Sequence, residues 1–202
     1  MQRLTLLSKG APAMRIFVLF GLMTIITGAT RTGLAAPVVK DGSFEQGNFT
    51  DMGNGYMELP SGSTTISGWT VSTSSGAIVW AKKTNVDHIS PSNGKYCIDL
   101  TGLGNNATNG AVSQAIHVKP GITYALSLEA ASFDDATPVV TVGGQVIALT
   151  AGTPIVVNGT SWTPLTGTFT VAKGSKTPIL TIENTTAGAQ LVFLDDVRIT
   201  AQ

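Results

Sequence analysis

Three carboxylates near the two ends of the chain have the residue types of a cation site. Glu45 closes residues 41–45 (DGSFE), and Asp195 and Asp196 lie within residues 194–198 (LDDVR). Calcium takes six to eight oxygen ligands, from carboxylates and backbone carbonyls, at no fixed sequence spacing. If the first and last strands of the domain meet, Glu45 and one of the two aspartates supply ligands to a structural calcium ion.

The surroundings of Asp195 leave a second interpretation open. In the predicted last strand, alternation places Asp195 on the same face as Phe193, Val197 and Ile199, while Asp196 points the other way beside Arg198. A buried carboxylate is costly unless it is paired, coordinated or hydrogen-bonded. Asp195 therefore either binds the ion or accepts hydrogen bonds from backbone N–H groups at a bulge.

Aromatic and amide side chains suggest where a sugar would bind. Tyr56 lies in a glycine-rich stretch and Trp80 precedes two lysines, so both are candidate platforms for sugar rings. Asn105, Asn106 and Gln114 carry paired donors and acceptors that suit sugar hydroxyls. Aromatic residues fill cores equally well, and an interior position of Trp80 is the open alternative.

The chain lacks the motifs of common enzymes. It has two histidines, His88 and His117, and no GxSxG, HExxH or CxxC motif. The acidic pair at Asp134 and Asp135 is interpreted as a solvated loop, although paired carboxylates are also what glycoside cleavage requires. We therefore expect no enzymatic activity and no catalytic residue.

Residues 1–35 are interpreted as a signal peptide. Basic residues precede an apolar run at 16–26, which is too short to span a bilayer, and small residues then offer a cleavage site after Ala35. An uncleaved anchor is the alternative. Cleavage leaves one domain, 36–202, without a stable membrane anchor. The expected location is extracellular, or periplasmic in a bacterium.

Charge and cysteine content restrict the partners. Loss of residues 1–35 removes four basic and no acidic residues, which leaves eight basic and twelve acidic residues and a net charge of −4. No basic stripe follows a phosphate backbone, so nucleic acid is excluded as a partner. The single Cys97 is either buried or bridged to another chain. Four N-x-S/T sequons begin at Asn48, Asn106, Asn158 and Asn184.

The pattern after the signal peptide is that of an all-β protein. Short alternating or β-branched runs are separated by Gly, Pro and Asn, and a two-residue hairpin turn is predicted at Gly143 and Gly144. Long polar loops are expected at 46–63 and 101–110. The fold class is an antiparallel β-sandwich. Predicted strands cover 38–45, 64–72, 77–81, 96–101, 111–118, 123–131, 139–142, 145–149, 162–171, 179–183 and 191–200.

Several short motifs, in order, resemble family 642 of the domains of unknown function, which are secreted proteins of plant cell walls and bacteria. The motifs are DGSFE at 41–45, ISGW at 66–69, PSNG at 91–94 before YCIDL at 96–100, VSQ at 112–114 with PGITY at 120–124, and LDDV at 194–197. The chain is similarly related to carbohydrate-binding modules with a galactose-binding-like jelly roll. The resemblance covers about residues 38–200.

The resemblance implies a jelly roll, a structural calcium ion held by Glu45 with Asp195 or Asp196, and polysaccharide binding without catalysis. The chain departs from plant members, which carry two such domains and several cysteines, and from bacterial members with a membrane sorting tail. The expected function is a secreted, non-catalytic domain that binds cell-wall or extracellular polysaccharide. The alternative is an adhesive matrix protein that self-associates without binding sugar.

Overall fold

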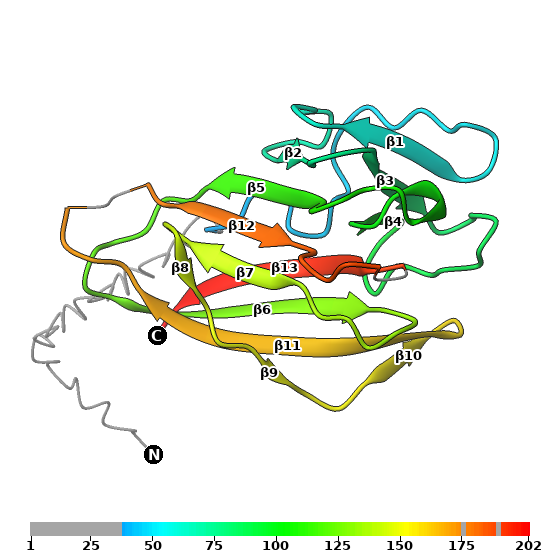
Figure 1. The fold of residues 1–202 in the computed structure, drawn as a ribbon. Coiled ribbons are helices and arrows are strands. Elements are labelled where there is room, and N and C mark those ends of the chain that lie inside the picture. The colour runs from blue at the N-terminus through cyan, green and yellow to red at the C-terminus, as the bar shows by residue number, and fades with distance from the viewer. Residues whose placement is uncertain (1–37, 175–176, 189–190) are drawn as a thin grey trace, which may run out of the picture. The chain divides into compact units, whose positions relative to one another are not determined.

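Alternating runs of β-branched and apolar residues build two antiparallel sheets in the computed structural model (Figure 1). The model describes residues 38–174, 177–188 and 191–202, and the expected signal peptide lies outside them. The described residues contain thirteen strands and one short 3₁₀ helix, η1 (Leu103–Asn105). None of the helical structure in this part of the chain is long and apolar enough to cross a bilayer.

The strands divide into a large and a small sheet. In spatial order, the large sheet consists of β1 (Tyr56–Pro60), β3 (Ala77–Lys82), β4 (Tyr96–Asp99), β13 (Phe193–Ala201), β6 (Thr123–Ala131), β11 (Thr160–Thr170) and β10 (Ile155–Val157), with β9 (Thr150–Ala151) also paired to β11. The small sheet consists of β2 (Thr70–Ser72), β5 (Ala111–Ala115), β12 (Ile179–Glu183), β7 (Val139–Val142) and β8 (Gln145–Val146).

The main core lies between the two sheets. Leu126 and Leu128 of β6 face it from the large sheet, and Leu180 and Ile182 of β12 face it from the small sheet. All four are buried, and the strands alternate between these inward residues and more exposed ones. The predicted antiparallel β-sandwich is confirmed, because two antiparallel sheets enclose this core.

A second apolar cluster covers part of the outer face, which is the face of the large sheet turned away from the small sheet. It contains buried residues of six strands of that sheet and Ile89 of the loop at 83–95, here called the covering loop. The members are Tyr56, Val79, Ala81, Ile89, Cys97, Ala131, Trp162 and Phe193. The covering loop therefore shields one end of the outer face. Cys97 is buried, and burial raises the pKa of its thiol.

Sequence pattern located the regular strands correctly. The bounds of β6, β7 and β12 match the predicted ranges residue for residue. The turn at Gly143 and Gly144 is also confirmed, because Val142 pairs with Gln145 and both glycines have positive φ, at 58° and 81°. Positive φ at both central residues is the geometry of a type I′ hairpin.

Two other predictions about the N-terminal half are wrong. Residues 38–45 form a turn instead of a strand, because Asp41 and Phe44 take left-handed φ values of 49° and 57°. The Asp41 carboxylate accepts hydrogen bonds from the backbone N–H groups of Glu45 (2.8 Å) and Gln46 (3.0 Å), which stabilises the turn. The predicted polar loop at 46–63 contains β1.

The predicted facing of the last strand is also wrong, because β13 contains a bulge. Its register against β6 shifts between Asp195 and Arg198, and Asp196 has a φ of 50°. The extra residue reverses the alternation. Asp195 consequently lies on the outer face with Phe193, while Val197 and Ile199 point into the main core.

Candidate functional site

A pocket of about 420 Å³ opens at one end of the outer face. It forms where β6 ends, β11 and β13 begin, and the covering loop passes beside them. Its lining mixes apolar and polar side chains, and consists of Asp87, His88, Ile89, Ala131, Ser132, Phe133, Asn158, Gly159, Thr160, Ser161, Leu191 and Phe193. A concave mixture of this kind is typical of small-molecule sites.

Asn85 fixes the pocket wall made by the covering loop. Its buried side chain donates from Nδ2 to the carbonyl oxygens of Lys82 and Ile89, both at 2.7 Å. Its Oδ1 accepts from the backbone N–H groups of Asp87 and Ile89, both at 3.1 Å. The turn places His88 at a φ of 56°, which is unusual for a residue with a side chain. One side chain thus determines the backbone path of this wall.

Tyr56 holds the Asp87 carboxylate at the pocket rim. The buried phenol hydroxyl donates to Asp87 Oδ2 at 2.6 Å and lies 3.2 Å from Asn85 Oδ1. Burial, and then the hydrogen bond to Asp87, raise the pKa of Tyr56, so the hydroxyl keeps its proton. Asp87 is solvent-exposed yet anchored through one oxygen. It is therefore an oriented hydrogen-bond acceptor.

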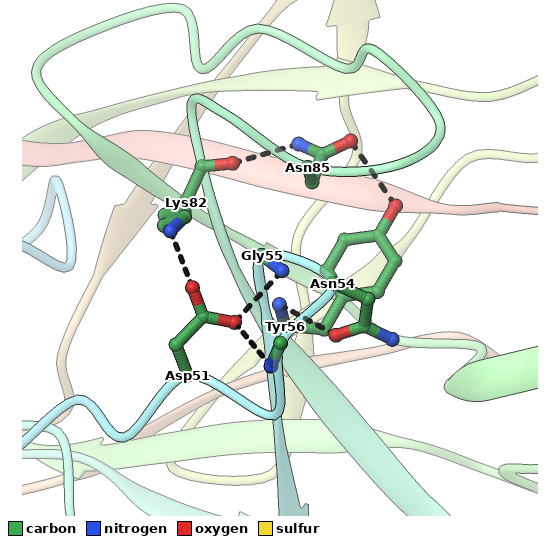
Figure 2. A network of polar contacts seen from close by, with 7 residues as sticks. Asp51, Asn54, Gly55, Tyr56, Lys82 and Asn85 are labelled. Atoms are coloured by element: carbon green, nitrogen blue, oxygen red, sulfur yellow. Dashed lines mark hydrogen bonds and ion pairs between the residues drawn. The ribbon is translucent and has the colours of Figure 1, made fainter.

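A polar network connects the loop before β1 with Lys82 and Asn85 (Figure 2). Asp51 Oδ1 accepts from the N–H groups of Gly53 and Gly55, both at 2.8 Å, and its other oxygen pairs with the Lys82 ammonium group. The Lys82 carbonyl in turn accepts the Asn85 amide. The loop before β1 and the start of the covering loop are thereby linked.

The opposite wall comes from the hairpin of β10 and β11. Val157 pairs with Thr160 across a two-residue Asn158-Gly159 turn. Thr160 Oγ1 accepts from Ser90 N–H at 2.8 Å, and the indole N–H of Trp162 donates to the Ser90 carbonyl at 2.9 Å. These bonds tie the hairpin to the covering loop, so the two walls are held together.

Phe133 is an exposed aromatic residue at the pocket. Its side chain is 69% exposed and follows the last residues of β6. It is not among the sugar-binding residues predicted from the sequence. Asp134 and Asp135 are exposed, as expected for a solvated loop, and Ser132 Oγ donates to Asp134 Oδ1 at 2.6 Å. A ring left in water at a pocket edge is a common feature of ligand sites.

Three of the predicted sugar-binding residues are not available at the surface. Tyr56 lies under the covering loop, and Trp80 points into the main core, where its indole N–H donates to the Phe44 carbonyl at 3.0 Å. Gln114 is buried and both ends of its amide bond the backbone of Lys40. The prediction that they are exposed ligand contacts is therefore wrong.

Asn105 and Asn106 are exposed, as predicted, but Asn105 is the last residue of η1, Asn106 follows it, and neither is in the pocket lining. Asn105 Oδ1 accepts from the backbone N–H of Leu191 at 3.1 Å, and Leu191 lines the pocket. A direct sugar contact by either asparagine stays a prediction.

The three acids predicted to bind calcium do converge, on residues 92–96 of the chain. Glu45 Oε1 accepts from the N–H groups of Lys95 (2.7 Å) and Tyr96 (2.9 Å). Asp195, with 0% exposure, accepts from Ser92, Asn93 and its neighbour Asp196. Asp196 contacts the Asn93 amide and pairs with Arg198, at 3.2 and 2.8 Å. The hydrogen bonds that the second interpretation assigns to Asp195 are therefore present at the bulge.

Gly94 is required for this arrangement. A Cβ atom there would lie 2.3 Å from Glu45 Oε1, and the φ of Gly94 is 71°.

Burial raises the pKa of Asp195 to about 7. Across the described ranges, no three His, Cys, Asp or Glu side chains are grouped as a metal site. The calcium ion thus stays a prediction.

Comparison with known proteins places the chain among sugar-binding domains. A family model described as a carbohydrate binding domain matches residues 36–188. The match supports the carbohydrate-binding part of the resemblance, and membership of family 642 stays a prediction. Among curated proteins, none matches the sequence.

Solved structures with a similar fold are distant. The enzymatically active domain of bacteriophage CBA120 tailspike protein 4 has a TM-score of 0.46 and 16% identity, over 82% of this chain and 21% of that one. The chain therefore spans about a fifth of the tailspike chain. A xylan-binding domain of Paenibacillus barcinonensis has a TM-score of 0.41 and 17% identity, over 72% and 92% of the two chains. A mannan-recognising module, TmCBM27, has a TM-score of 0.42 and 13% identity, over 73% and 98%.

Proposed function

Because the chain belongs to the carbohydrate-binding domain family whose model it matches, we propose that it binds a glycan in the pocket at the end of the outer face. One observation carries this choice of site: the exposed Phe133 ring adjoins a pocket whose Asp87 carboxylate is held by Tyr56. The ring packs against the apolar C–H groups of a sugar, and Asp87 accepts from its hydroxyls. Asn158 and Ser161 offer further polar groups on the opposite wall.

In this proposal the protein is secreted and non-catalytic. The basic and apolar N-terminal sequence supports export. His88 is the histidine of the pocket, and the pocket carboxylate Asp87 is engaged by Tyr56. This favours a binding role, in which the fixed walls orient a glycan without cleaving it.

Replacing Phe133 by alanine is expected to weaken glycan binding by roughly tenfold or more, because the stacking surface is lost. Affinity gel electrophoresis on a panel of soluble polysaccharides, with xylan and mannan included, measures the effect. Val146→Ala on β8 is the matched control, since Val146 is 64% exposed and lies on the small sheet. Its affinity should equal that of the wild type.

Equal retention of the Phe133 and Val146 variants would exclude the pocket as the site. If the wild type binds no glycan and instead assembles with concentration in light scattering, the self-associating matrix protein becomes the better hypothesis.

A structural calcium ion at residues 92–96 is the second part of the proposal. Glu45, Asp195 and Asp196 each contact this segment, and Arg198 pairs with Asp196. The residues suit the ion by donor type, although several of their oxygens already accept N–H groups. Glu45 with Asp195 or Asp196 would hold it, and its charge would offset the repulsion between the acids.

Removing calcium with a chelator is then expected to lower the midpoint of thermal unfolding by roughly 5–10 °C, because a bound ion stabilises only the folded state. Glu45→Gln tests the assignment, because the Gln amide oxygen keeps the acceptor for Lys95 and Tyr96 but removes the charge. This variant should show little response to the chelator. A wild type without any response would leave hydrogen bonding as the whole role of these acids.

A further inference from the structure

The charge around the pocket is negative. Asp87 stands at the rim, and Asp134 and Asp135 are exposed directly after Phe133. The lining residues include no Lys or Arg. His88 is the other ionisable side chain of the lining, so the pocket offers a ligand carboxylate no permanently charged partner.

The lysines near the pocket do not line it. Lys83 and Lys95 are exposed at the two ends of the covering loop, but neither is among the lining residues. Lys82 pairs with Asp51, and Arg198 pairs with Asp196. Among the described residues, no Lys or Arg of the lining therefore compensates the charge of an acidic ligand.

Hydrogen bonds also fix the position of the Asp87 carboxylate. Its Oδ2 accepts the Tyr56 hydroxyl at 2.6 Å, and its backbone N–H is bound to Asn85. A carboxylate of an acidic glycan in the pocket would lie near the fixed Asp87 carboxylate, and the two like charges would repel each other. Because the pocket partly encloses the ligand, water screens this repulsion less than in open solvent.

We propose that the pocket selects glycans by charge: it accepts neutral glycans and rejects chains of uronic acids, with Asp87 as the discriminating residue. This rests on the proposed function, because it assigns a ligand class to the same pocket. Neutral hydroxyls donate to Asp87, whereas a carboxylate brings only acceptors and a like charge. The selection is electrostatic, so it weakens as salt is raised.

The test compares a neutral glucan or mannan with the same polymer after its C6 hydroxyls are oxidised to carboxylates. Wild-type protein should bind the oxidised form at least roughly tenfold more weakly at low salt, with a smaller gap at high salt. Asp87→Asn, which keeps the shape and an acceptor for Tyr56, should narrow this ratio to roughly threefold or less. Asp135→Asn should narrow it less, and asparagine tolerates the positive φ of 58° at that position.

The outcomes separate the two proposals. If the wild type binds neither form, the proposed function fails. If it binds the neutral form and binds the oxidised form as tightly, the glycan-binding function stands and charge selection is overturned. An unchanged ratio in a folded Asp87→Asn variant removes Asp87 from the discriminating role and equally overturns the inference.

Discussion

Lowering the pH from 8 to 5 is expected to raise the free energy of unfolding of this domain. Burial raises the pKa of Asp99 from 3.8 to about 7. At pH 5 the folded state therefore keeps a proton that the unfolded chain releases, and this contribution is lost as the pH rises through about 7. The slope is about 1.4 kcal/mol per pH unit for one such group, so the effect from Asp99 is roughly 3 kcal/mol. Asp195, with its pKa also raised to about 7, acts in the same direction.

Urea unfolding across this pH range measures the effect. A chelator is present, so that no cation is bound by Glu45, Asp195 or Asp196. Asp99→Asn is the decisive variant, because Oδ1 carries the hydrogen bonds from the Thr101 N–H and hydroxyl groups and asparagine keeps that acceptor. The variant should lose about half of the pH dependence and be more stable than the wild type at pH 8. An unchanged slope would assign the effect to other groups.

One exposed group acts in the opposite direction but outside this range. The hydrogen bond from Lys82 lowers the pKa of Asp51 to about 2. Its stabilising contribution is present above pH 4 and is lost only as the pH falls towards 2. The rise in stability between pH 8 and pH 5 is consequently a property of the buried acids.

The strands that sequence predicted well are those whose side chains alternate without interruption. The run from Thr123 to Ala131 places Leu126 and Leu128 on the core face, and the observed strand has the same bounds. The hairpin turn at Gly143 and Gly144 was predictable for the same reason, since both its residue types and its geometry are local.

Burial of the aromatic residues was not predictable, because it depends on segments far away in the chain. Tyr56 follows a glycine as a loop residue would, yet it begins β1 and is covered by residues 83–95. The orientation of Asp195 depends on a bulge, and a bulge adds one residue without any composition signal. Glu45 and Asp195 both contact residues 92–96, and the sequence did not indicate which face Asp195 takes.

The pocket is assembled from four segments, near residues 87–89, 131–133, 158–161 and 191–193. No sequence motif spans them. Phe133 carries no periodic signal, because it follows the end of a strand. Side-chain to backbone hydrogen bonds hold these segments in place. Thr160 and Trp162 bond the backbone of Ser90 and so join the hairpin to the covering loop. Within the covering loop, Asn85 fixes the path of residues 87–89.

Replacing Asn85 by alanine is therefore expected to lower the free energy of unfolding by about 3–5 kcal/mol and to abolish glycan binding together. Four hydrogen-bonding groups lose their partner: the carbonyls of Lys82 and Ile89 and the N–H groups of Asp87 and Ile89. The Tyr56 hydroxyl keeps its hydrogen bond to Asp87. Buried polar groups without partners cost about 1–3 kcal/mol each, and relaxation of the loop recovers part of that. Urea unfolding and affinity electrophoresis measure the two effects.

Asn184→Ala separates this role from the general cost of removing a buried asparagine. Asn184 is also buried, and it follows the last residue of β12 on the small sheet. Among the described residues, its side chain accepts one backbone hydrogen bond, from Thr186 N–H at 3.1 Å. Its loss should cost about 1 kcal/mol and leave glycan affinity unchanged. A folded Asn85→Ala variant that binds glycan normally would show that the pocket wall does not need this anchor. Conversely, equal destabilisation by both variants would mean that burial, and not the number of bonds, sets the cost at these positions.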